Sequence, residues 1–241
     1  MARKLARGVC LAAVLYAVVA PVRGAADDVG MDILIGRMDR LWAQRETAEA
    51  LHDLVALGMI ALAIDPQSYE ATWRLAQAYF WVAHTQPDRL FKKAMAAKAS
   101  ERAQQAVEIQ PERVEGRYLY AVAVGEYAST IGIMKAVTEG VAGKIETAAL
   151  KAYELDRDFD SGAPMMLLGR YYYMLPWPKR DLDRSRRYLE ELKSRHPKVL
   201  TGRCYLAETY YAQGEKDQAR AELDFVAQNG AQPCAQEALK R

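Results

Sequence analysis

The chain has 241 residues, of which 51% are hydrophobic, with 33 basic and 31 acidic side chains. This near-neutral balance argues against a protein that binds nucleic acid, because such proteins are usually strongly basic. It also gives no indication of an anionic membrane surface as a partner. The length is sufficient for one sizeable domain.

The first residues have the form of a secretory signal peptide. Three basic side chains open the chain, residues 8–22 carry no charge, and small residues precede Ala25 at the −3 and −1 positions. The apolar run is short for a membrane span. We therefore predict a signal peptide at 1–24 and a single domain at 25–241, with an uncleaved membrane anchor as the alternative.

Removal of residues 1–24 takes four of the 33 basic residues and leaves 29 against 31 acidic ones, a net charge of −2. Cys10 precedes the apolar run, whereas a lipid-anchored cysteine follows one, so no lipidation site is predicted. Cys204 and Cys234 remain. They either form a disulfide that holds the C-terminal tail to the last helices or stay as two buried thiols, and both readings are structural.

A repeat organises the rest of the chain. Strand signals are almost absent, and prolines and glycines separate segments of helical length. Four segments end alike at spacings of 45, 46 and 40 residues, with proline as the usual stop because it lacks the N–H. They are "LAIDP" at 62–66, "VEIQP" at 107–111, "YELDR" at 153–157 and "KSRHP" at 193–197.

The residues before each stop keep one helical register. In the second segment Ala99, Ala103 and Ala106 follow the i, i+4, i+7 spacing of one helix face, and their small size lets a neighbouring helix approach closely. Partner helices follow at 69–80, 162–173 and 200–223, with a weaker one at 114–127. These patterns predict an all-α, tetratricopeptide-like array of about five helical hairpins over 30–228, stacked into a superhelix.

No pattern for catalysis, a metal or a cofactor is present. His52, His84 and His196 lack a second ligand at metal spacing, and there is no Cys-x-x-Cys. Residues 139–146 resemble a phosphate loop superficially, but Thr138 stands where the first glycine is needed. We therefore predict a protein without catalytic residues, and an enzyme of unknown type is the least favoured of three hypotheses.

Aromatic residues gather at "YYYMLPWPKR", residues 171–180. Leu168, Tyr172 and Leu175 share one helix face and are expected in the core, so the tyrosines on either side of Tyr172 flank that face. The stretch is either a packed turn or the wall of an apolar cavity. The predicted ligand-binding residues are Tyr171, Tyr173, Trp177, Trp73, Phe80, Trp81 and Tyr127, and the predicted partner-binding residues are Arg170, Lys179 and Arg180.

The stretch "GAPMMLLGRYYYMLPWPKRDLDRSRRYLEEL" and the "YLAE" helix with its glycine turn resemble the T component of tripartite ATP-independent periplasmic (TRAP) transporters. That resemblance implies a periplasmic location, association with the solute-binding P component, a homotrimer and a hydrophobic tunnel. Members of that family are often lipoproteins, and this chain differs from them in that respect.

The leading hypothesis is thus a non-enzymatic periplasmic accessory protein that binds a P component and an apolar or carboxylated small ligand. The alternative is a generic tetratricopeptide scaffold for protein–protein interaction in the cell envelope, with no ligand.

Overall fold

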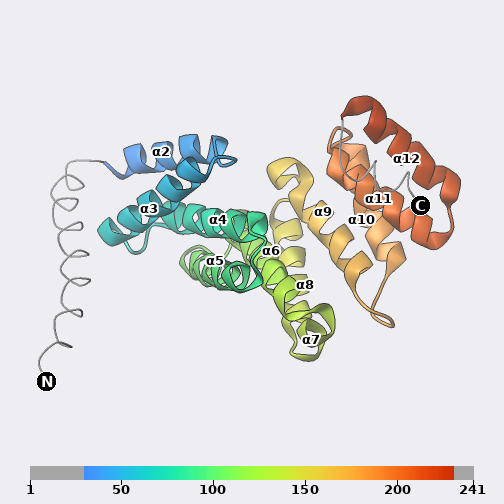
Figure 1. Ribbon diagram of the computed structural model, residues 1–241, viewed down its shortest axis with the longest axis horizontal. Helices are drawn as coiled ribbons and strands as arrows, with labels where there is room; N and C mark the ends of the chain where they lie inside the picture. Colours follow the sequence, from blue (N-terminus) through green and yellow to red (C-terminus); the bar gives the residue numbers. More distant parts are fainter. Residues whose placement is uncertain (1–29, 231–241) are drawn as a thin grey trace, which may run out of the picture.

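The computed structural model describes residues 30–230. The predicted signal peptide at 1–24 and Cys234 lie outside this range, so the signal peptide and the pairing of Cys234 stay predictions. Within the described range the secondary structure is entirely helical, which confirms the all-α class (Figure 1). The helices are α2 (Met31–Ala43), α3 (Ala48–Ile64), α4 (Tyr69–Thr85), α5 (Arg89–Ile109), α6 (Val114–Ile131), α7 (Ile133–Thr138), α8 (Val141–Leu155), α9 (Phe159–Met174), α10 (Leu182–Arg195), α11 (Leu200–Gln213) and α12 (Lys216–Asn229).

The helices form five antiparallel hairpins, as the repeat predicts. In each hairpin a first helix, called helix A, packs on a second, called helix B. The pairs are α2–α3, α4–α5, α6–α8, α9–α10 and α11–α12, and the short α7 lies in the turn of the third pair. In Figure 1 the hairpins follow one another across the molecule from α2 to α12.

The stacking has an inner and an outer layer. Successive A helices contact each other, from α2 against α4 to α9 against α11, whereas each B helix contacts mainly the A helices on its two sides. The A helices therefore lie closer together than the B helices, and the array curves around the A layer. This arrangement is the superhelix expected of stacked helical repeats.

The helix ends match the predicted stops. Four B helices end at Ile64, Ile109, Leu155 and Arg195, each at the third residue of one of the five-residue stop segments. Several helix starts are capped by side chains that accept a hydrogen bond from the first turn, for example Ser68 from the amide of Ala71 at 3.3 Å. Local sequence thus sets the ends of these helices.

Small residues allow the helices to approach one another. The buried residues of α5 are four alanines and Val107. A Cβ atom added to Gly169 on α9 would lie 2.4 Å from the Cγ atom of Leu189 on α10, and one added to Gly202 would lie 2.3 Å from a methyl carbon of Leu192. Leucine side chains therefore fill the space that glycine leaves at these helix contacts.

We expect Gly169→Ala to lower the free energy of unfolding by about 1–3 kcal/mol, because the new methyl group overlaps with Leu189. Urea denaturation measures the change. Gly125→Ala is the matched control: Gly125 is also inside a helix, and a Cβ there meets no atom within 4 Å. This control should raise stability by up to about 1 kcal/mol. Equal effects of the two substitutions would contradict close packing at Gly169.

Candidate functional site

An open pocket of about 350 Å³ lies where the third and fourth hairpins meet. Its walls come from the corner between α7 and α8, the end of α9, and the loop into α10. Small residues at the start of α8 leave the space open, and the ring of Tyr171 and the side chain of Leu175 form its apolar part. The lining residues are Val137, Gly140, Ala142, Gly143, Glu146, Tyr171, Tyr172, Leu175, Lys179, Asp181 and Arg184.

Glu146 on α8 is the polar centre of this pocket. Its carboxylate accepts a hydrogen bond from the Tyr172 hydroxyl at 2.7 Å, and the Arg184 guanidinium lies 3.7 Å from the same oxygen. Arg184 also donates to the Tyr172 hydroxyl at 3.2 Å. The hydroxyl of Tyr171 donates to the carbonyl of Ala142 at 3.0 Å. These bonds connect α8, α9 and α10 and fix the shape of the pocket.

The hydroxyls of the two tyrosines donate hydrogen bonds here and stay protonated near neutral pH. Burial, supported by the hydrogen bond to Glu146, raises the pKa of Tyr172 to about 12. Burial likewise raises the pKa of Tyr171 above its ordinary value. A general acid or base needs a pKa near the working pH. Neither phenol therefore has the pKa of a general acid or base near neutral pH.

Two of the predicted ligand- and partner-binding residues, Tyr171 and Lys179, line this pocket. Tyr173 points elsewhere: its ring lies between the guanidinium groups of Arg170 and Arg180, at 5.2 and 4.4 Å from the ring centre. Trp177 is 88% exposed and packs into no core. Leu168, Tyr172 and Leu175 are buried, which confirms their predicted place in the core.

The other predicted ligand-binding residues lie in different parts of the array. Trp81 on α4 packs edge-on against Trp42 in the first hairpin. Phe80 stacks on His84, and the Trp73 indole N–H donates to Glu70 at 2.9 Å. Tyr127 lies on α6, beneath the ammonium group of Lys93. The predicted aromatic residues thus do not line one cavity, and their ligand-binding role remains a prediction.

Sequence reasoning missed Glu146 and Arg184, which hold the polar side of the pocket. Glu146 is 26 positions before Tyr172, and no local pattern links the two. Only the crossing of α8 over α9 brings them together. In residues 30–230 no group of acidic, histidine and cysteine side chains is placed to hold a metal ion. The same part of the chain has no helix with the length and hydropathy of a membrane span.

The fold defines a tetratricopeptide-like helical-repeat protein. Three solved structures agree with it. TTC0263, a TPR protein of Thermus thermophilus, has 16% identity and a TM-score of 0.68, covering 88% of this chain and 100% of its own. YrrB, described as a TPR protein with an unusual peptide-binding site, has 16% identity and a TM-score of 0.54, covering 91% and 98%. MamA has 14% identity and a TM-score of 0.54, covering 83% and 91%. Such identities show the fold alone.

The family described as "Regulator of microtubule dynamics protein 1-3" matches residues 34–184. Because this match spans more than half of the sequence, the chain belongs to that family. No curated protein gives a significant match.

The resemblance to the TRAP transporter T component is therefore wrong. The matching family is a different one, and the similar structures are TPR proteins. The features behind that resemblance, an aromatic helix end and a "YLAE" helix with a glycine turn, fit tetratricopeptide hairpins in general. The P component as partner and the homotrimer rested on that resemblance and lose their support with it.

The raised pKa of Tyr172 predicts a loss of stability in alkali. Above pH 10 the unfolded chain releases the phenol proton while the folded chain keeps it, so the contribution is complete below pH 10 and lost between about pH 10 and 12. Between pH 10 and 11 the free energy of unfolding of Tyr172→Phe should therefore fall by about 1 kcal/mol less than that of the wild type, as measured by urea denaturation. Tyr211→Phe, at an exposed tyrosine, is the control. If the free energy of unfolding falls equally with pH in the wild type and in Tyr172→Phe, the raised pKa of Tyr172 makes no contribution to stability.

Proposed function

We propose that this protein is a non-catalytic interaction scaffold that binds a partner protein through its inner layer of A helices. One cluster carries the proposal. Arg170 on α9 lies over the rings of Tyr173 and Tyr205, at 5.2 and 4.5 Å from their centres. Its guanidinium also pairs with Glu208 on α11 at 2.5 Å. The cluster joins two successive A helices, and its side chains are half-buried, so a partner has access to them.

This combination of residues suits protein recognition. Tyrosine and arginine are enriched among the residues that dominate binding energy at protein interfaces. Stacking on two rings fixes the plane of the Arg170 guanidinium, so less side-chain freedom is lost when a partner binds. The paired Glu208 limits non-specific attraction of anions to this cation. A partner segment with an apolar side chain and a backbone carbonyl or carboxylate would complement the cluster.

The pocket beside Glu146 provides a second contact point for such a partner. Its volume of about 350 Å³ admits one large side chain or a chain end. The description of YrrB, which includes a peptide-binding site, supports a peptide-like occupant for an array of this fold. The raised pKa of Tyr171 and Tyr172 supports binding without catalysis.

A small carboxylated ligand is the second candidate for the pocket. Lys179 and Arg184 both line it and would attract an anion. We also propose that the protein is exported to the periplasm, on the strength of the basic start and apolar run within residues 1–24.

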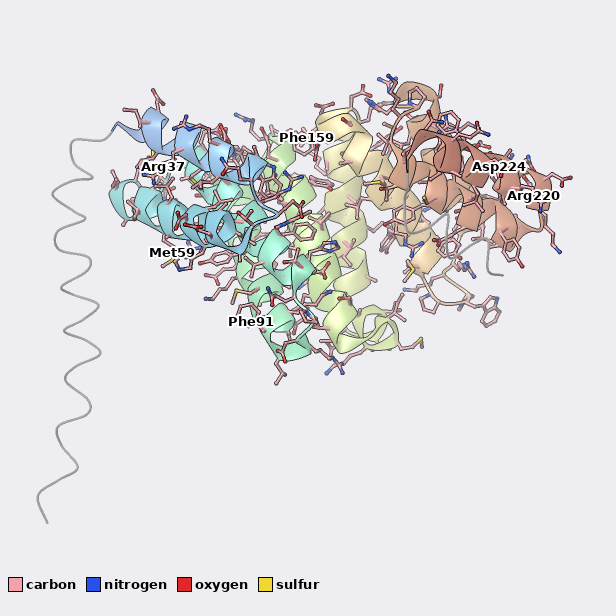
Figure 2. All side chains as sticks on the ribbon, turned by 45° about the horizontal axis from the view of Figure 1, so that its top comes forward. Arg37, Met59, Phe91, Phe159, Arg220 and Asp224 are labelled. Atoms are coloured by element: carbon pink, nitrogen blue, oxygen red, sulfur yellow. The ribbon has the colours of Figure 1, made fainter. Side chains whose placement is uncertain are left out.

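Site-specific photo-crosslinking tests the proposed function. A photoreactive side chain at Tyr205 should give one discrete crosslinked protein in the host, whereas the same group at Asp224, on α12 and labelled in Figure 2, should not. Arg170→Ala should reduce the Tyr205 crosslink about tenfold, because it removes the centre of the cluster.

The same crosslinking experiment can also contradict the proposal. Equal crosslinking from Tyr205 and Asp224, or a Tyr205 crosslink that Arg170→Ala leaves unchanged, would show that the inner layer is not the binding surface.

A further inference from the structure

The exposed apolar side chains of this protein gather on one edge of the superhelix. We define the A–B edge as residues 86–93, 131–144 and 174–181, where helix A joins helix B in the three central hairpins. Ten large hydrophobic side chains are exposed in the described part of the chain, and six of them lie on this edge. These six are Leu90, Phe91, Ile133, Met134, Met174 and Trp177. The turns on the opposite edge, at 64–69, 109–116, 155–161 and 195–200, carry only Ile64.

The three turns of the A–B edge lie next to one another. Arg89 at the start of α5 donates a hydrogen bond to the carbonyl of Thr130, near the end of α6, at 2.7 Å. Val137 of α7 and Leu175 after α9 line the same pocket. In Figure 2 the start of α5, where Phe91 is labelled, α7 and the loop after α9 follow the lower margin of the molecule. The segments that carry the exposed apolar residues therefore lie along one margin of the molecule, across three hairpins.

The charge on this edge is basic although the whole chain is near neutral. The A–B edge carries seven basic and three acidic residues, whereas the opposite turns carry four basic and six acidic ones. Two of the three acids serve as helix caps: Asp88 accepts from the amide of Phe91, and Asp181 accepts from the amide of Arg184. The third, Glu139, pairs with Lys135 at 3.6 Å. Lys92 pairs with Glu126, which lies outside the edge, and a basic excess still remains beside the apolar residues.

We infer that the A–B edge binds the surface of an anionic lipid bilayer. Lysine and arginine beside a bilayer are attracted to acidic headgroups, and apolar side chains between them enter the interfacial region. Trp177, almost fully exposed at the tip of a loop, has the amphipathic ring that favours this interface. This inference extends beyond the proposed binding of a protein partner, which uses the Arg170 cluster of the inner A layer and, as a second contact point, the pocket that borders this edge.

The arrangement of the apolar residues favours a bilayer over a partner helix. A helix-binding groove needs a concave apolar strip that accepts side chains at i, i+3 and i+4 spacing. Here the apolar residues lie in three separate segments, namely the first turn of α5, the short α7, and the end of α9 with the loop after it. Three separate segments do not form a groove, but they can contact one flat surface together. The excess of positive charge on the edge favours a surface that carries acidic lipid headgroups.

Vesicle binding tests the inference. The purified chain should co-sediment with vesicles of phosphatidylcholine containing about a third phosphatidylglycerol, and less with phosphatidylcholine alone. The triple variant Leu90→Ser, Met134→Ser, Trp177→Ser should bind the anionic vesicles about tenfold more weakly. Its matched control is Ile33→Ser, Met59→Ser, Ile64→Ser, which changes three exposed side chains on other faces and should alter binding by less than about twofold.

Residues 1–29 contain no tryptophan, so fluorescence quenching provides a readout of the described part of the chain. Brominated lipids in the anionic vesicles should quench part of the tryptophan emission, and Trp177→Phe should remove that part. Absence of Trp177 quenching, or equal vesicle binding by the two triple variants, would overturn the inference. If the edge variant keeps vesicle binding but loses the crosslinked protein, the edge is a protein surface and the inference is wrong.

Discussion

The fold depends on close contact between small helix faces. Each hairpin has a stripe of alanine and glycine that a neighbouring helix covers, as Ala99, Ala103 and Ala106 show on α5 with no exposed area. A stripe of this kind has little apolar surface to bury. It gains dispersion contacts only when the next helix lies directly on it. The hairpins therefore stabilise one another in sequence, and the curvature of the array follows from the tighter A layer.

Local sequence was sufficient to predict the all-α class, the five hairpins and their ends. Proline and polar residues stop the B helices at the predicted places, because a helix end is set by residues within one turn of it. The burial of Leu168, Tyr172 and Leu175 followed from helical periodicity in the same way. These features need no knowledge of how one hairpin lies against another.

The candidate site could not be predicted from the sequence, because it depends on how the hairpins cross. Tyr171, Tyr173 and Trp177 are neighbours in sequence but point to a pocket, to the Arg170 cluster and to solvent, respectively. The family was also assigned wrongly from the sequence. Amphipathic hairpins of similar length share aromatic and small residues at fixed positions whatever their function, so those positions report the fold and not the family.

Native-state hydrogen exchange tests the dependence of each hairpin on its neighbours most directly. If the hairpins stabilise one another in sequence, the amides of α5 and α6, which have hairpins on both sides, should open with the highest free energy. The amides of α2, which has a described neighbour on one side only, should open with a lower one. Slower exchange in α2 than in α5 and α6, or one common opening free energy throughout, would contradict this account.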